Sequence, residues 1–139
     1  MKLVELSMQN VGLELARNVT PGERAAFCVP VQVDNGSKIN PGALLLLEHR
    51  VVVAWSEGIR KPKPHSVTHA LSAVSDVRSF KQKAGMFSAQ LDAISFVARG
   101  TRLEMVLYSQ VMHQRLAPMI TGTLDGSFTY TWGEKPADD

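Results

Sequence analysis

Two apolar runs near the middle of the chain give the clearest hydrophobic pattern in the sequence. They cover 44–47 and 51–55 and are separated by the polar triplet 48–50. The second run is β-branched and ends on an aromatic residue, which favours a strand. A single long helix is the alternative, but Pro41-Gly42 before the segment and Gly58 after it limit the runs to strand lengths. The pattern therefore predicts a central antiparallel hairpin with the triplet as its turn.

An amphipathic helix is predicted before this hairpin. Val4, Met8, Val11 and Leu15 recur at spacings of four, three and four, which is the period of one helix face. Leu6 and Leu13 widen that stripe, so we expect residues 1–19 to form a helix that docks on a sheet. A short strand over 12–16 is the alternative.

Alternating residues predict strands on both sides of the hairpin. After the turn 20–23, Phe27, Val29, Val31 and Val33 share one parity. Pro30 lies within that strand and has no N–H, which places it at an edge or a bulge. Further strands are expected over 65–71, over 72–81 with a bend near Ser75, over 89–98 and over 103–108, the last two joined by a turn at 99–101.

The period changes near the C-terminus. Apolar residues recur every three to four positions over 109–124, which predicts an amphipathic helix over 111–125, with Pro118 expected to kink or restart it. Phe128, Tyr130 and Trp132 then alternate with serine and threonines. We expect a final strand or an ordered arm there, whose aromatic face is covered.

The length of 139 residues suits one domain, assigned to 1–133 and followed by a solvated tail over 134–139. Its parts are a helix over 1–19, strands over 20–110, a helix over 111–125 and an extra strand or arm over 127–132. No apolar run approaches the roughly 20 residues that span a bilayer. A single cysteine, Cys28, excludes an internal disulfide, and we expect it to be a passive small residue. The expected compartment is the cytoplasm.

Charge is distributed unevenly along the chain. The net charge is only +2, but eight basic and two acidic residues give the segment 60–102 a charge of +6, and the remainder carries −4. Such asymmetry suits an anionic partner, although solvated strand edges also favour lysine and arginine. The candidate anion-binding residues are Arg60, Lys61, Lys63, Lys81 and Lys83. No aromatic residue interleaves with them to stack a base, so nucleic acid is not an expected partner.

The sequence lacks the patterns that usually carry catalysis or cofactor binding. There is no phosphate loop, no dinucleotide fingerprint, no GxSxG or HExxH motif and no paired-carboxylate pattern. His65 and His69 can share one face of a strand, but a zinc site needs three or four ligands. We therefore expect no enzyme activity, no metal and no cofactor.

The order of elements resembles bacterial pleckstrin-homology-like and GRAM-like domains. The resemblance rests on the turn Pro21-Gly22-Glu23 and on the sequence Leu45-Leu46-Leu47-Glu48-His49-Arg50-Val51-Val52, and it extends over about 20–124. It implies a mainly β (α+β) fold: a bent antiparallel sheet, nearly a barrel, capped by a C-terminal helix, with an extra N-terminal helix here. The family includes lipid binders and peptide binders. Its phosphoinositide motif lies in the loop after the first strand, where this chain has only Lys38.

These observations predict a non-enzymatic binding module. The favoured function is protein–protein association or self-association, through the face formed by Phe128, Tyr130 and Trp132 or through a strand edge that adds a partner strand. The exposed pair Met86 and Phe87 is expected to meet a partner chain or to close one end of the barrel, with insertion at a membrane interface as the alternative. The alternative is peripheral binding to anionic lipid head groups at the inner membrane face through the basic residues of 60–83. The sequence does not decide whether the barrel also holds a pocket for a small molecule.

Overall fold

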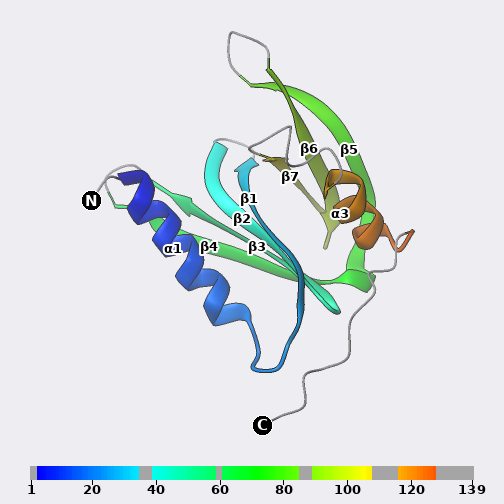
Figure 1. The fold of residues 1–139 in the computed structure, drawn as a ribbon, viewed down its shortest axis with the longest axis horizontal. Helices are drawn as coiled ribbons and strands as arrows, with labels where there is room; N and C mark the ends of the chain where they lie inside the picture. Colours follow the sequence, from blue (N-terminus) through cyan, green and yellow to red (C-terminus); the bar gives the residue numbers. More distant parts are fainter. Residues whose placement is uncertain (1–2, 35–38, 59–60, 85–88, 108–115, 128–139) are drawn as a thin grey trace.

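The structure is a computed structural model that describes residues 3–34, 39–58, 61–84, 89–107 and 116–127 (Figure 1). Its elements, in chain order, are α1 (Leu3–Asn18), β1 (Ala25–Asp34), β2 (Ile39–Leu47), β3 (Arg50–Glu57), β4 (Lys63–Ala70), the 3₁₀ turn η1 (Leu71–Ala73), β5 (Val74–Ala84), β6 (Ala89–Ala98), β7 (Thr101–Leu107) and α3 (Leu116–Asp125).

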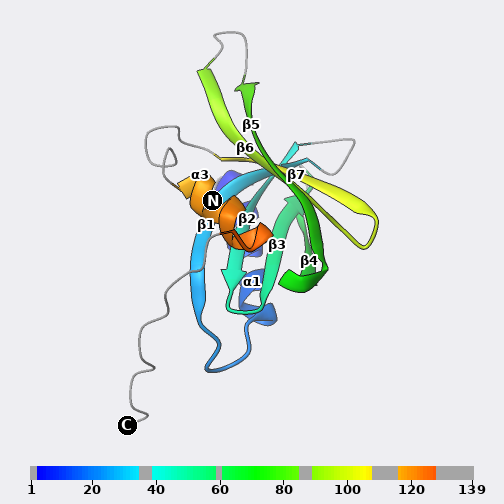
Figure 2. The same cartoon turned by 90° about the vertical axis from the view of Figure 1, so that its right-hand side faces the viewer.

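The strands form one antiparallel sheet of seven strands in the order β4-β3-β2-β1-β7-β6-β5. The sheet is strongly twisted, so its β5–β6 end is turned away from its β3–β4 end (Figures 1 and 2). Helix α1 packs on β2, β3 and β4, and α3 packs on β5 and β6. The predicted fold class, a bent and mainly β sheet with an N-terminal and a C-terminal helix, is confirmed.

The central hairpin is buried on both faces. One face of β2 and β3 packs in the inner core with β1, β6, β7 and α3, where Leu44, Leu46, Val51 and Val53 are almost fully buried. The other face packs under α1 in a second cluster. Strands covered on both faces read as continuous apolar runs rather than as alternation, which explains the pattern of 44–55.

The hairpin itself is confirmed, with a two-residue connection at Glu48-His49 and Leu46 opposite Val51. Close packing in β2 also requires Gly42. A Cβ at that position would lie 2.4 Å from the Ala54 carbonyl oxygen, which is too close for any side chain.

The prediction of a docked N-terminal helix is confirmed, and one part of its stripe is corrected. Val11 and Leu15 are buried against the sheet. Leu13 is 62% exposed, because it lies two residues from each of them and therefore on the solvent side of the helix. Within the described residues, no helix combines the length and apolar character that crossing a bilayer requires.

Two prolines lie inside regular elements, at positions that tolerate a missing backbone N–H. β1 is the central strand, but it pairs with β7 only from Val31 to Asp34. Pro30 therefore lies where one side of β1 has no paired strand, which is a local edge as the sequence predicted. Pro118 is the third residue of α3, and the first turn of a helix tolerates proline. Residues 111–115, which the sequence assigns to the same helix, lie outside the described residues, so the kink or restart expected near Pro118 stays a prediction. The expected irregularity near Ser75 is confirmed by a register shift between Ser75 and Arg78.

Candidate functional site

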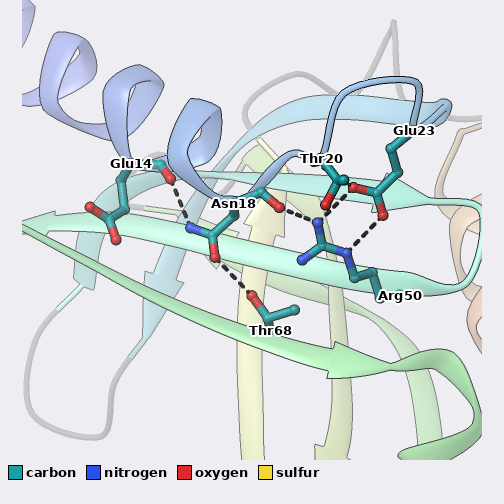
Figure 3. A network of polar contacts seen from close by, with 6 residues as sticks. All are labelled: Glu14, Asn18, Thr20, Glu23, Arg50 and Thr68. Carbon is teal, nitrogen blue, oxygen red and sulfur yellow. Dashed lines mark hydrogen bonds and ion pairs between the residues drawn. The ribbon is translucent and has the colours of Figure 1, made fainter.

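A polar cluster joins the C-terminal end of α1 to the sheet (Figure 3). The Arg50 guanidinium donates to both carboxylate oxygens of Glu23, at 2.8 and 2.6 Å, and to the main-chain carbonyl of Asn18. The Asn18 side-chain amide donates to the Glu14 carbonyl at 2.8 Å and accepts from the Thr68 hydroxyl at 3.1 Å. These bonds connect α1, the following turn, β3 and β4, so the cluster holds the helix on the sheet.

The charges in this cluster neutralise each other. The hydrogen bonds from Arg50, followed by the one from the Thr20 backbone N–H, lower the pKa of Glu23 to about 2. The Glu23 carboxylate in turn raises the pKa of Arg50. Because its donors already meet a carboxylate and a carbonyl, Arg50 is a structural residue and a poor candidate for ligand binding.

A pocket of about 280 Å³ opens between β4 and the end of the β6–β7 hairpin. Figure 2 shows this hairpin end extending on the side of the molecule where β4 lies. The pocket is smaller than most small-molecule sites, which measure roughly 300–1,000 Å³. Its lining is mainly apolar and consists of Val67, His69, Phe96, Ala98, Arg99, Thr101 and Leu103. Such a pocket can accept one side chain or a small apolar group.

His69 lines the pocket and carries a buried polar atom without a partner among the described residues. Its ring meets Phe96 edge-on, with centroids 6.4 Å apart and planes at 81°. Its Nδ1 is buried and has no hydrogen-bond partner among the described residues. Burial, and then the charge of Arg99, lower the pKa of His69, so the imidazole is neutral at pH 7. Buried polar atoms normally have a partner, and this one has none among the described residues.

Arg99 lies at the rim of the pocket in an uncommon backbone conformation. Arg99 and Gly100 form the two-residue β6–β7 turn with φ values of +53° and +77°. Two positive φ values are typical of a type I′ turn, which prefers Asn-Gly. Arginine there costs about 1 kcal/mol or more. Arg99 is exposed and forms no hydrogen bond or ion pair within the described part of the chain. Strain at a rim residue with a free charge is a signal of function.

The outer edge of β4 adjoins this pocket. β4 is the first strand in the sheet order, and no described segment pairs with its outer side. Arg50 lies opposite Ala70, and the Leu71 N–H donates to the His49 carbonyl at 2.9 Å. That bond flanks a non-hydrogen-bonded pair, so Ala70 and every second residue before it direct their backbone groups away from β3. The outward-facing residues are Pro64, Ser66, Thr68 and Ala70.

The side chains of β4 divide between the two faces of the sheet. The Ser66 hydroxyl donates to Glu14, and the Thr68 hydroxyl donates to Asn18, so both lie on the α1 face. Val67 and His69 alternate with them and line the pocket on the opposite face. The free edge and the pocket are therefore adjacent features of one strand.

The predicted anion-binding residues do not come together. Lys61 and Lys63 are exposed around the β3–β4 connection, and neither forms an ion pair within the described residues. Lys81 lies on β5, at the other end of the strand order, and forms an ion pair with the buried Asp92. Arg60 lies outside the described residues, as does the side chain of Lys83. Of the predicted anion-binding residues whose side chains are described, Lys61 and Lys63 are exposed, and the charge of Lys81 is neutralised by Asp92.

The predicted interface residues all lie outside the described residues. They are Met86, Phe87, Phe128, Tyr130 and Trp132. Their role in association stays a prediction.

Histidine and cysteine do not form a metal site in the described part of the chain. His65 stacks on Trp55, with centroids 5.8 Å apart, and His69 contacts Phe96. No group of three or more potential ligand residues gathers among the described residues. Cys28 is exposed, and partial burial raises the pKa of its thiol, so the reactive thiolate is disfavoured at pH 7.

The sequence reasoning missed Arg99 and His69 as candidate site residues. In the sequence, Arg99 is part of a predicted turn, and His69 is one of two histidines that are too few for a metal site. The available signal was the dipeptide Arg99-Gly100 between two predicted strands, because a two-residue hairpin turn imposes positive φ on a residue type that rarely adopts it.

No family model and no curated protein matches the sequence. The hSac2 domain from human phosphoinositide phosphatase Sac2 matches the fold with a TM-score of 0.56 and 13% identity, over 100% of this chain and 98% of that one. The C-terminal domain of an unknown protein from Leishmania infantum matches with a TM-score of 0.52 and 15% identity, over 82% and 93%.

The N-terminally truncated linker-DH/PH domains of p115-RhoGEF also match, with a TM-score of 0.52 and 11% identity. This match covers 86% of the present chain and 34% of the other, so the chain spans about a third of that length. These likenesses show the pleckstrin-homology-like fold, and that part of the sequence resemblance is confirmed. The GRAM-like and bacterial assignments remain predictions.

Proposed function

We propose that the protein is a non-enzymatic binding module that recognises another protein by adding a strand to the free edge of β4, and that it self-associates in this way. The proposal places the module in the cytoplasm and, on sequence resemblance, among bacterial PH-like and GRAM-like domains. The observation that carries it is the row of outward-facing backbone groups on Ser66, Thr68 and Ala70, next to a mainly apolar pocket.

Strand addition uses the two features that lie together here. Main-chain hydrogen bonds to an edge strand supply affinity, and pockets for alternate side chains supply specificity. An added segment would bond to the outward N–H and C=O groups of β4. Every second side chain of that segment would face the same side as Val67 and His69, where the pocket opens.

The other outer strand is protected against such pairing. β5 has a register shift between Ser75 and Arg78, and its Lys81 is paired with the buried Asp92. Bulges, inward-pointing charges and covering helices are means by which proteins block sheet edges. β4 carries Lys63 and Pro64 at its beginning and is packed on one face by α1, but its pairing with β3 has no register shift and no described segment covers its outer edge. The contrast favours β4 as the recognition edge.

The proposal is tested by removing one outward N–H with Ala70→Pro. Ala70 has φ −59° and ψ 141°, which proline adopts without strain, and its N–H does not bond to β3. The variant should therefore fold normally and lose a hydrogen bond only to an added strand. We expect light scattering to show a concentration-dependent multimer for the natural chain and a monomer, or at least a tenfold weaker association, for Ala70→Pro.

Ala70→Ser is the matched control, since it changes the same side chain and keeps the N–H. It should associate as the natural chain does, and both variants should unfold at similar urea concentrations. A natural chain that stays monomeric, or an Ala70→Pro variant that associates as tightly as Ala70→Ser, would contradict the proposal.

The exposed pair Lys61 and Lys63 supports a second candidate function, binding to anionic lipid head groups. If this candidate is right, the double variant Lys61→Glu/Lys63→Glu should lose binding to phosphatidylserine vesicles at low salt while Ala70→Pro retains it. The strand-addition proposal expects the reverse pattern in the association assay: Ala70→Pro dissociates the multimer, and the double lysine variant does not.

A further inference from the structure

We propose that the pocket beside β4 receives an aromatic side chain from residues 128–134 of a second copy, and that Arg99 binds the carboxylate of Glu134 of that copy. This inference rests on the strand addition proposed above and names the segment that is added. The occupant is thus a stretch of this same chain, supplied by another molecule.

The first argument is the position of the pocket relative to the β4 edge. Val67 and His69 are two residues apart on β4 and both line the pocket. In a sheet, residues on one face of neighbouring strands lie side by side, with cross-strand Cβ atoms about 4.5–5.5 Å apart. A segment added to β4 would therefore bring two of its same-face side chains next to Val67 and His69, over the pocket.

The second argument is the pattern of the chain's own C-terminal segment. Phe128, Tyr130 and Trp132 share one parity, and Glu134 continues it. As a strand, this stretch would present aromatic side chains and one carboxylate on a single face, with threonines 129 and 131 on the other. An aromatic-and-acidic face is complementary to a mainly apolar pocket with a cation at its rim.

The third argument is the state of Arg99. Its guanidinium has no acceptor among the described residues, and it occupies a left-handed turn position that favours asparagine or glycine. A planar guanidinium with free donors suits a carboxylate, which it can bind through two parallel hydrogen bonds. His69 adds an unpartnered buried nitrogen on the same pocket wall. The pocket therefore has, in Arg99, the charged donor that an acidic partner would use.

The exchange can be reciprocal, which suits self-association. In a two-fold dimer each copy offers the same surfaces, so each would give its 128–134 segment and receive the segment of the other. Both β4 edges and both pockets would be occupied at once. The assembly would then close as a dimer, because no free edge of this kind would remain.

A charge exchange between Arg99 and Glu134 tests the inference in the full chain. Arg99→Glu and Glu134→Arg should each weaken dimerisation at least about tenfold, because each places like charges together. The double variant Arg99→Glu/Glu134→Arg should restore the dissociation constant to within about threefold of the natural value. Analytical ultracentrifugation measures all four constants. Lys61→Glu is the control for net charge and should change the constant less than about threefold.

Substitutions in the added segment test the aromatic part. Trp132→Ala should weaken dimerisation at least about tenfold, because it removes a large apolar side chain from the pocket face. Thr131→Ala, on the opposite parity, should change the dissociation constant less than about twofold. Circular dichroism checks that every variant is folded.

The results separate this inference from the proposed function. If Ala70→Pro abolishes association while neither charge reversal weakens it, strand addition at β4 stands and the assignment of Arg99 and Glu134 is overturned. Single reversals that weaken the dimer without rescue in the double variant also overturn the pairing. A natural chain that is monomeric at all concentrations overturns both proposals.

Discussion

Arg50 and Arg99 both lie at two-residue hairpin turns of the same sheet, but their surroundings are opposite. Arg50, at the start of β3, bonds to the Glu23 carboxylate and to the Asn18 carbonyl (Figure 3). Arg99, in the β6–β7 turn, has no such partner among the described residues and has a positive φ. The first arginine holds α1 against the sheet. The second adds strain and leaves a charge free at the rim of a pocket.

The comparison separates an arginine that stabilises the fold from one that is available for recognition. Removal of Arg50 leaves a half-buried carboxylate unpaired, whereas removal of Arg99 relieves an unfavourable turn. The same kind of substitution should therefore have opposite effects on stability at the two positions.

Arg50→Met should lower the free energy of unfolding by about 3 kcal/mol. The substitution breaks a partly buried ion pair and leaves both the Glu23 carboxylate and the Asn18 carbonyl without their partner. Urea unfolding followed by circular dichroism measures the change. Arg17→Met is the matched control: its side chain is 75% exposed and lies 3.6 Å from Glu14, so it should cost less than about 0.5 kcal/mol. Equal losses of unfolding free energy in Arg50→Met and Arg17→Met would show that the polar cluster around Arg50 does not hold α1 on the sheet.

Acid should remove the contribution of Glu23 to stability. Its pKa falls from an ordinary 4.5 to about 2 on folding, so the folded state favours the carboxylate. The stabilisation is complete above pH 4.5 and is lost as the pH falls to 2. We expect the natural chain to lose about 2 kcal/mol more than Arg50→Met between pH 5 and pH 2, from urea unfolding at each pH. Parallel pH profiles for the two proteins would contradict the assignment.

The strands could be predicted because the burial of a strand on one or both faces leaves a local pattern of apolar residues in the sequence. The double burial of 44–55 appears as two uninterrupted apolar runs, and the one-sided burial of β1 appears as alternation of Val29, Val31 and Val33. The prediction for Leu13 was wrong because the spacing of a widened apolar stripe does not determine which of its residues face the sheet.

The pocket beside β4 could not be predicted from the sequence, because it depends on contacts between segments that are distant in the chain. Nothing in the sequence near Arg99 indicates that β4 lies across the pocket, or that Lys81 is neutralised by Asp92 on the neighbouring strand. The net charge of +6 over 60–102 suggested one cationic surface, whereas the fold places Lys61 and Lys81 on connections and strands at opposite ends of the sheet order. The order of charges along the sequence does not indicate how far apart the fold places them.

Arg99→Asn should raise the free energy of unfolding by about 0.5–1 kcal/mol. Asparagine adopts positive φ more readily than arginine, and Asn-Gly is a preferred type I′ turn. Arg99→Ala, which keeps the steric cost of the left-handed conformation, is the matched control and should leave stability within about 0.5 kcal/mol. Thermal and urea unfolding of the three proteins measure the effect. Destabilisation by Arg99→Asn would mean that the arginine makes a stabilising contact, as Arg50 does.

Arg99→Asn should also raise the pKa of His69. This is the smallest of the predicted effects. Burial is the main cause of the lowered value and remains in the variant, whereas the repulsion from Arg99 is removed. The folded state holds His69 neutral, so stability declines as the pH falls through the ordinary value of 6.5. That decline should begin at the same pH but be smaller in the variant. Titration of the imidazole by NMR follows the pKa directly, with Lys61→Asn as the charge-matched control. An unchanged His69 pKa in Arg99→Asn would mean that the guanidinium lies too far from the pocket wall to meet a carboxylate bound there.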